Sequence, residues 1–392
     1  MKPQVDRQTY ETLDNIDAEC IRCELLCSED CEILQEIAPT TPGDVARQVL
    51  GGQVDEEIRR FLLRCSLCGL CVNSCPKSLD IPQMVTAARR VMVDTGMTDT
   101  EVYRIMWVDH DWNAITLFRD TYQLNFDNLV KEKCYTLFMP GCSLANEAPQ
   151  LIYTTIDWLN GQGGGKAGVT LMCCGRPLLE MGLTERAERY ERSFWQKVKD
   201  TGARRVVVAC PNCFHHLIAS ELKKDIEVVS MLELMVKSGL RVPSAKGKKI
   251  TIHDSCPSRY GEMGKWARQL LGDYEITEME HHGKNSICCG SGGVVSMVDR
   301  ELHDNRARKR VQEFKNTGAD TCVTYCMACW NTLSRKAVQG NVRFILELVF
   351  DQFIDHAEYQ NKLRAMWEGE WGVYNDFRLR NSKMLDECGN EI

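Results

Sequence analysis

The first 130 residues carry apolar side chains at helical spacing. Such positions recur within 45–50 and 54–63, on either side of the Gly51-Gly52 turn, and again over 84–130, together with many aromatic residues. This period predicts amphipathic helices that each bury one face. We therefore predict a mostly helical N-terminal part, in which 84–130 forms a packed connector or, alternatively, a surface that binds a partner.

From residue 135 onward the pattern changes to short apolar runs that alternate with charged, amphipathic segments. The runs 135–139 and 250–253 are typical of strands, and each leads to a helical segment that ends in the sequence Lys-x-Thr-Gly-Ala. Glycine is a common stop at the C-terminal end of a helix. After the first stop, Val206-Val207-Val208 predicts a buried parallel strand. The later part of the chain is therefore predicted to be α/β.

The α/β part is a duplication. Its cysteines recur at nearly constant offsets of 114, 115 and 116 residues. The corresponding pairs are Cys142 and Cys256, Cys174 and Cys289, and Cys210 and Cys326. An offset that stays so steady over a whole unit indicates an internal repeat. We predict two α/β modules related by a pseudo-two-fold axis, with the cysteines in loops at strand ends.

The amino-acid composition argues against some classes of function and favours metal binding. With 48 Lys and Arg against 55 Asp and Glu, the formal net charge is −7, which gives no basic footprint for a nucleic acid partner. The 21 cysteines are an odd number in a chain too long to need disulfide bonds, so metal binding is the better interpretation. The chain begins without an apolar secretion signal, and no apolar run approaches the ~18 residues of a transmembrane segment. We expect it in the cytoplasm, or at the cytoplasmic face of a membrane through a partner.

Two tight cysteine runs lie in the helical part. Cys65-x2-Cys68-x2-Cys71-x3-Cys75-Pro76 matches the bacterial ferredoxin run, in which three thiolates bind one cubane 4Fe-4S cluster and the fourth binds another. Cys20-x2-Cys23-x3-Cys27-x3-Cys31 departs from it by one extra residue and by lacking the proline. If the exchange holds, one cubane takes Cys20, Cys23, Cys27 and Cys75, and the other takes Cys65, Cys68, Cys71 and Cys31. Structural zinc is the alternative, although zinc sites favour Cys-x2-Cys pairs with longer spacers.

Each α/β module carries five cysteines, one more than a cubane cluster needs. The sets are Cys142, Cys173, Cys174, Cys210 and Cys213 in the first copy, and Cys256, Cys288, Cys289, Cys326 and Cys329 in the second. Adjacent side chains diverge, so they are poor ligands for one regular cube but can bind different irons of an elongated cluster. The hypothesis is an open, non-cubane cluster in each module.

These motifs resemble those of the catalytic subunit of heterodisulfide reductase, a family that joins a ferredoxin-like domain to two CCG modules. The resemblance covers about 15–345, including both Cys-Cys-Gly sequences. It implies a non-cubane 4Fe-4S cluster in each module, a shared cleft where a disulfide is cleaved, and a flavin- or cytochrome-containing partner that supplies electrons. Family members often have His-Asp-Pro-Cys at the start of the second module, where this chain has His253-Asp254-Ser255-Cys256.

Three residues are expected to act on a small disulfide substrate. Cys174 and Cys289 are expected to hold the clusters where the sulfur chemistry occurs, and His282 to donate a proton, since histidine titrates near neutral pH. The glycine-rich stretch 161–167 lacks the spacing of a phosphate-binding loop, and no dinucleotide-binding glycine motif is present. We therefore expect no flavin or nicotinamide on this chain.

The favoured activity is that of a thiol/disulfide oxidoreductase. One alternative is an electron relay, without a thiol substrate, in a complex that reduces quinone, fumarate or aromatic acyl-CoA compounds. The other is a zinc-binding scaffold protein.

The expected domains are a helical ferredoxin-like domain with its connector (1–130), two CCG modules (131–245 and 246–350) and a C-terminal tail (351–392). We expect the tail to be packed on the surface or frayed, or alternatively to lie on a partner protein. Three cysteines that fit no motif are expected to be free thiols; they are Cys134, Cys322 and Cys388.

Overall fold

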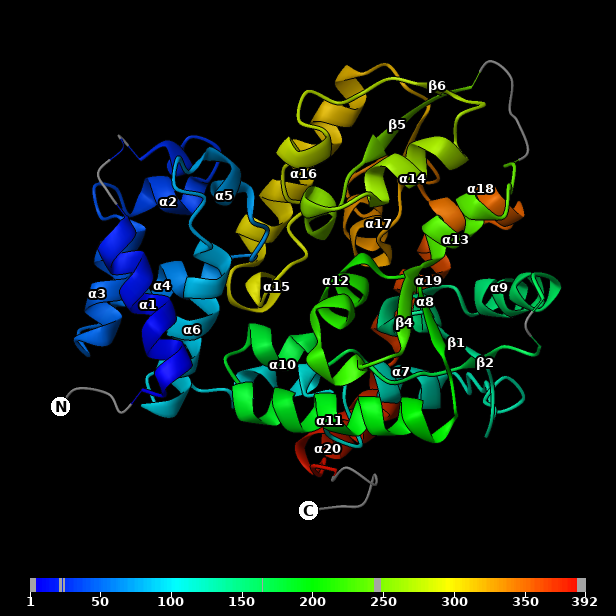
Figure 1. The fold of residues 1–392 in the computed structure, drawn as a ribbon, viewed down its shortest axis with the longest axis horizontal. Helices are drawn as coiled ribbons and strands as arrows, with labels where there is room; N and C mark the ends of the chain where they lie inside the picture. The colour runs from blue at the N-terminus through cyan, green and yellow to red at the C-terminus, as the bar shows by residue number, and fades with distance from the viewer. Residues whose placement is uncertain (1–4, 21–22, 24, 164, 243–247, 386–392) are drawn as a thin grey trace.

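A helical N-terminal domain precedes two α/β modules, and the three units pack against one another (Figure 1). The computed structural model describes residues 5–20, 23, 25–163, 165–242 and 248–385. Both sheets are parallel and four-stranded. The mixed α/β class predicted from the sequence is confirmed.

Polar residues start the helices of the N-terminal domain. The side chain of Asp6 caps the first of them, and Thr41 and Asp44 form a reciprocal capping box at the third. The elements, with the connector, are α1 (Arg7–Glu19), η1 (Leu26–Ser28), α2 (Glu32–Glu36), α3 (Pro42–Leu50), α4 (Glu56–Arg64), α5 (Leu70–Ser74), α6 (Ile81–Asp94), η2 (Glu101–Met106) and α7 (Ala114–Thr121). The apolar faces of α1 to α6 form one buried core that includes Leu13, Val45, Phe61 and Met84.

The first module has the strand order β2-β1-β3-β4. Its elements are β1 (Thr136–Met139), α8 (Cys142–Glu147), α9 (Pro149–Gly161), β2 (Gly168–Val169), α10 (Arg176–Glu180), α11 (Thr184–Asp200), β3 (Arg205–Val208), α12 (Pro211–Ala219), η3 (Glu221–Lys223), β4 (Glu227–Ser230) and α13 (Met231–Lys237). The central strands β1 and β3 are apolar and almost wholly buried, as expected for a parallel sheet covered on both faces.

The second module has the corresponding order β6-β5-β7-β8. Its elements are β5 (Lys249–His253), η4 (Cys256–Tyr260), α14 (Met263–Leu270), β6 (Glu275–Ile276), η5 (Gly283–Asn285), α15 (Val295–Val298), α16 (Arg300–Asn316), β7 (Thr321–Thr324), α17 (Met327–Ser334), β8 (Val342–Phe344) and α18 (Ile345–Phe350). Strand for strand, it repeats the first module.

The repeat extends to single residues. Helices α11 and α16 are each 17 residues long, and each is followed by a glycine in the left-handed region, Gly202 at φ 70° and Gly318 at φ 67°. In both modules the first cysteine of the set follows the first central strand, and the Cys-x-x-Cys follows the second. Because parallel strands end at the same edge of a sheet, this places the cysteine loops together.

The connector and the C-terminal helices pack on the first module rather than on the helical domain. Tyr103, Trp107 and Phe126 belong to the same buried core as the strands of the first module. Helices α19 (His356–Ala365) and α20 (Gly369–Arg380) cover the connector, where Met366 packs against α7 and the guanidinium of Arg378 lies 3.5 Å from the ring centroid of Trp112. The described part of the C-terminal segment is therefore packed on its own chain, and Cys388 lies outside the described residues.

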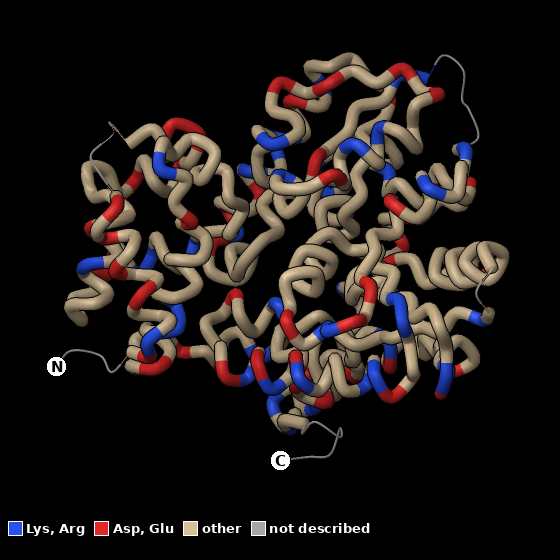
Figure 2. The backbone as a smooth tube through the Cα atoms, viewed as in Figure 1, with Lys and Arg blue, Asp and Glu red and all other residues tan. Residues whose placement is uncertain are grey.

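Ion pairs join the helical domain to the second module. Arg64 lies 2.7 Å from Asp299, and Arg306 lies 2.6 Å from Glu32. Lys and Arg are interspersed with Asp and Glu along the backbone (Figure 2). Among the described helices, none is long and apolar enough to cross a membrane.

Candidate functional site

The two N-terminal cysteine runs are interleaved in space. One cavity is lined by Cys20, Cys23, Cys27 and Cys75, and a second is lined by Cys31, Cys65, Cys68 and Cys71. Each run thus contributes three cysteines to one cavity and its last cysteine to the other. These are the two ligand sets predicted from the ferredoxin-type exchange, and their binding of iron belongs to the proposal below.

Burial disfavours the charged thiolate form of these cysteines. It raises the pKa of Cys27 to about 12, and the nearby sulfurs of Cys23, Cys20 and Cys75 add to the shift. Burial likewise raises the pKa of Cys31 to about 11, together with the neighbouring Cys65. A bound metal ion offsets the cost of burying the negative thiolate, because its positive charge stabilises the deprotonated sulfur. Groups of four soft sulfur donors in a buried cavity fit iron in a 4Fe-4S cluster.

The loop between Cys65 and Cys71 is held by the second module. Tyr260 donates a hydrogen bond of 2.9 Å to the carbonyl of Gly69, and Arg259 donates one of 2.9 Å to the carbonyl of Cys68. Gly69 has φ 74°, and a Cβ there would lie 2.6 Å from the Tyr260 hydroxyl, so the close approach requires glycine. The ferredoxin-type loop is therefore docked on the turn that follows Cys256.

In the first module, the five sulfurs of the set come from three segments of the chain and form a connected group. Cys173 interacts directly with Cys142 and Cys174, and Cys213 interacts directly with Cys174 and Cys210. Cys210 is the N-cap residue of α12. The positive end of a helix stabilises a thiolate, which favours this position for a metal ligand.

The second module repeats this arrangement. Cys288 interacts directly with Cys256 and Cys289, and the sulfurs of Cys289 and Cys329 are 3.2 Å apart. Cys326 is the N-cap residue of α17, in the position that Cys210 has in the first module. Each set therefore brings its five predicted ligands together.

A buried histidine distinguishes the second module. Arg310 donates a hydrogen bond of 2.9 Å from Nε to Nδ1 of His253, which leaves the proton of the neutral ring on Nε2. Within the described residues this buried Nε2 has no partner, and a ring nitrogen of His253 lies within 4.8 Å of the sulfurs of Cys289 and Cys329. An electron-rich sulfur cluster held by these cysteines would supply the missing acceptor. The first module has the apolar residues Met139 and Phe194 at the corresponding positions.

Direct interactions between sulfurs join the ferredoxin-type loop and the two module sets in one line. Cys68 of the ferredoxin-type loop interacts directly with Cys288 of the second module. At the other end of that set, Cys326 interacts directly with Cys210 of the first module. The order in space is therefore helical domain, second module, first module, which differs from the order in the sequence.

A cavity of about 270 Å³ lies between the modules and the ferredoxin-type loop. Its lining includes Cys68, Asn212, His215, Cys256, Cys289, Cys326 and Cys329. Of the three residues expected to act on a substrate, only Cys289 lies here. Cys174 does not line this cavity.

The expectation for His282 is not supported by its position. Its ring is exposed, Nδ1 lies 2.9 Å from the carbonyl of Met279, and the residue does not line the inter-module cavity. The histidine in the cavity is His215, which α12 directs toward Gly261 of the second module. His215 follows Cys213 by two residues, and nothing in the local sequence indicates its contact across the modules.

Comparisons with known proteins agree with this arrangement. A model of the cysteine-rich domain CCG matches residues 136–218 and 250–334, and a model of the 4Fe-4S dicluster domain matches residues 19–80. An uncharacterized iron–sulfur protein of Methanocaldococcus jannaschii is 24% identical over 334 residues, which cover 79% of this chain and 66% of that protein. The chain thus spans just under two thirds of the length of this relative.

Two further relatives carry functional names. One is a component of the dihydromethanophenazine:CoB–CoM heterodisulfide reductase of Methanosarcina barkeri, 23% identical over 75% of this chain and 78% of its own length. The other is a component of the CoM/CoB fumarate reductase of Methanothermobacter marburgensis, 23% identical over 79% of this chain and 66% of its own length. The chain therefore belongs to the iron–sulfur proteins in which a 4Fe-4S dicluster domain is followed by two CCG domains, and it is similar to a heterodisulfide reductase component.

Proposed function

We propose that this iron–sulfur electron-transfer protein carries electrons from two cubane 4Fe-4S clusters through two non-cubane clusters to a disulfide bound between the CCG modules. The observation that carries this proposal is the continuous line of sulfurs from Cys68 through Cys288 and Cys326 to Cys210. Adjacent ligand sets keep successive electron carriers close, which a relay requires. When bound, the clusters supply one-electron transfer and irons that can bind sulfur.

Cationic side chains support the junction between the helical domain and the second module. Arg306 lines the same cavity as Cys68 and Cys288, and its charge interacts favourably with both sulfurs. A fixed positive charge stabilises thiolates that are buried away from water. Arg306 also pairs with Glu32, which holds its guanidinium at the junction. We assign to Arg306 the role of stabilising the site where electrons pass between the two units.

The inter-module cavity is the proposed site of disulfide cleavage. Reduction of a disulfide takes two electrons and two protons and yields two thiols. Cys289 and Cys326 line the cavity from the second module, and Cys326 adjoins Cys210 of the first. A substrate in the cavity would therefore contact the second module's set directly and the first module's set through Cys326 and Cys210. A flavin- or cytochrome-containing partner is proposed as the electron source, because the named relatives are components of multi-chain reductases.

One observation favours a second candidate, the relay without a thiol substrate. The cavity is lined by cysteines of the second module's set, whereas no cysteine of the first module's set lines it; those of the second module are Cys256, Cys289, Cys326 and Cys329. A chain in which only one site meets the cavity can pass electrons onward without cleaving sulfur bonds itself. One relative is named as a component of a fumarate reductase, and that name includes fumarate as well as CoM and CoB.

A spectroscopic experiment separates the two candidates. We expect the oxidised holoprotein to develop a new paramagnetic EPR signal on addition of 2-mercaptoethanol or cysteine, because a thiol would bind at the cluster site of Cys289. The variant Cys134→Ser is the control, since this buried cysteine fits no ligand set and should leave the signal unchanged. If neither thiol produces a signal, while reduced protein still passes electrons to an added acceptor, the relay is correct.

A further inference from the structure

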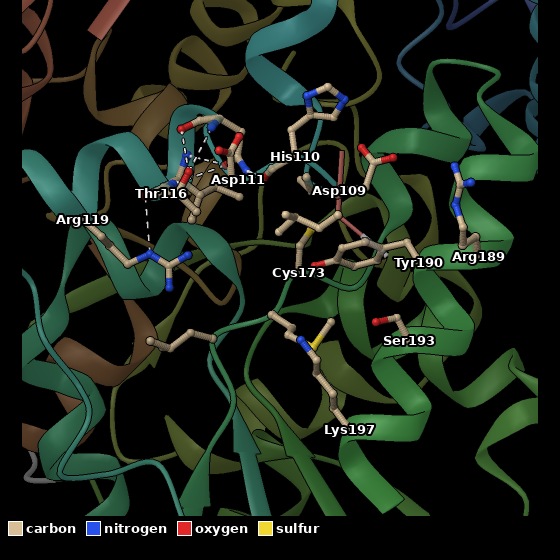
Figure 3. Close-up of a pocket in the computed structure, with 16 residues that line it drawn as sticks. Asp109, His110, Asp111, Thr116, Arg119, Cys173, Arg189, Tyr190, Ser193 and Lys197 are labelled. Carbon is tan, nitrogen blue, oxygen red and sulfur yellow. Dashed lines mark hydrogen bonds between the residues drawn. The ribbon is translucent and has the colours of Figure 1, made fainter. Parts of the chain in front are cut away.

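A second cavity lies on the first module, away from the one between the modules. It has a volume of about 290 Å³ and is bounded by the loop before α7, by α7 itself and by α11 (Figure 3). Cys173 forms part of its wall. Figure 3 shows Arg119 entering from α7, whereas Arg189, Tyr190, Ser193 and Lys197 come from α11. None of these residues lines the inter-module cavity.

The internal repeat gives this cavity a counterpart. Helices α11 and α16 align residue by residue, so Tyr190 corresponds to Arg306 and Ser193 to Lys309. In the second module, Arg306 and Lys309 line a cavity together with Cys288 and the ferredoxin-type cysteines. In the first module, the same face of the helix, with Cys173 in place of Cys288, lines the 290 Å³ cavity. In the second module the helical domain packs against this face of the helix. In the first module the corresponding face lines an open pocket.

The pocket is positively charged. Arg119, Arg189 and Lys197 line it, and within the described part of the chain none of them forms an ion pair. The two lining carboxylates are engaged elsewhere, because Asp109 forms a bidentate pair with Arg186 and Asp111 accepts hydrogen bonds from the backbone N–H groups of Trp112 and Lys383. These hydrogen bonds do not cancel the charge of Asp111, but the three cations outnumber that one carboxylate, so the remaining positive charge favours an anion.

Arg119 connects the pocket to the cysteine site. The only hydrogen bond of its side chain among the described residues is a long one of 3.4 Å from Nε to the carbonyl of Ile115. Burial lowers the pKa of Arg119, whereas the neighbouring Cys142, Tyr190 and Cys173 oppose the shift. A half-buried guanidinium without a carboxylate partner is costly, and a bound anion offsets that cost.

We propose that this pocket binds a small, redox-active organic anion that exchanges electrons with the cluster site of Cys173. This pocket is the first module's counterpart of the surface on which the helical domain docks. It adjoins Cys173, in the set at the opposite end of the line of sulfurs from Cys68. The electron exchange rests on the relay in the proposed function, whereas binding of the anion does not. Electrons that enter through Cys68 and Cys288 thus have an exit at Cys173 that is separate from the inter-module cavity.

The binding test uses 1,4-naphthoquinone-2-sulfonate as the anionic probe and uncharged 1,4-naphthoquinone as its neutral match. Titration of the oxidised holoprotein by calorimetry should give saturable, salt-sensitive binding of the sulfonate. Arg119→Gln and Lys197→Gln should each weaken it about tenfold or more, since each removes a charged hydrogen-bond donor. Lys199→Gln removes an exposed charge from the same helix outside the pocket and should have no effect. Equal binding by all four proteins, or no binding by the parent, overturns the proposal.

The electron-transfer test follows reoxidation of the dithionite-reduced, desalted holoprotein. Each quinone takes two electrons from the clusters and two protons from water and becomes the hydroquinone. The sulfonate should reoxidise the parent faster than it reoxidises Arg119→Gln. The neutral quinone should reoxidise both proteins at the same rate. Binding without this difference overturns the exchange of electrons at Cys173. If the probe binds and reoxidises the parent as expected but no disulfide is turned over, the proposed anion pocket is supported and the proposed disulfide cleavage is wrong.

Discussion

The Cys289→Ser variant is expected to lose disulfide turnover while its ferredoxin-type clusters remain reducible. Cys289 lies between Cys288 and Cys329, 3.2 Å from the sulfur of the latter, and faces the inter-module cavity. Serine offers a harder oxygen that poorly replaces a bridging thiolate in an iron–sulfur cluster. We expect the iron content to fall by about four per chain, the content of one cluster. The cubane ligand sets, which end at Cys75, are untouched.

The measurement combines iron analysis, EPR of the reduced protein and disulfide-dependent reoxidation. Cys322→Ser is a matched control, because this cysteine is also buried in the second module but belongs to no ligand set. It should retain iron and turnover. Undiminished turnover by Cys289→Ser would show that the second module is not the site of sulfur chemistry.

Replacing Arg310 by Leu is expected to destabilise the protein by about 3–5 kcal/mol, the usual cost of removing one partner from a buried ion pair. Arg310 is almost fully buried, pairs with Glu313, and donates to the carbonyl of His281 and to Nδ1 of His253. The substitution removes the arginine from Glu313 and leaves this buried carboxylate with the ring of His281 as its remaining side-chain partner. It also frees the ring of His253 to change tautomer beside Cys289.

Denaturant unfolding of the holoprotein, followed by circular dichroism, measures this effect. Arg308→Leu on the same helix is the control, since its side chain is 57% exposed and its ion pair to Asp304 is long at 4.0 Å. A surface change of this kind usually stays within about 0.5 kcal/mol. Equal unfolding midpoints for the two variants would contradict the role assigned to the buried arginine.

The cysteine sets and the repeat could be predicted from the sequence because both depend on local spacing. A two-residue gap in a turn determines which sulfurs converge, and a constant offset between copies determines that their sheets have the same strand order. The predicted sets accordingly occupy common cavities. The predicted helices at 45–50 and 54–63 correspond to α3 and α4.

The surroundings of the cysteines could not be predicted, because they are made by contacts distant in the sequence. Arg259 reaches the carbonyl of Cys68 across 191 residues, and nothing in the spacing of either residue indicates this contact. His282 was predicted as a proton donor from its residue type, yet its side chain is exposed and it does not line the inter-module cavity. The aromatic connector likewise has its partners in the first module and in α19 and α20 rather than in a helix bundle of its own.

The most direct test of the account is the iron and acid-labile sulfide content of anaerobically purified holoprotein, with the clusters distinguished by Mössbauer spectroscopy. Four clusters of four irons predict about 16 iron atoms per chain, half of them in the two CCG modules. A content near 8, with only the spectrum of cubane clusters, would contradict the account. It would leave the two five-cysteine sets without the clusters on which the proposed line of electron carriers depends.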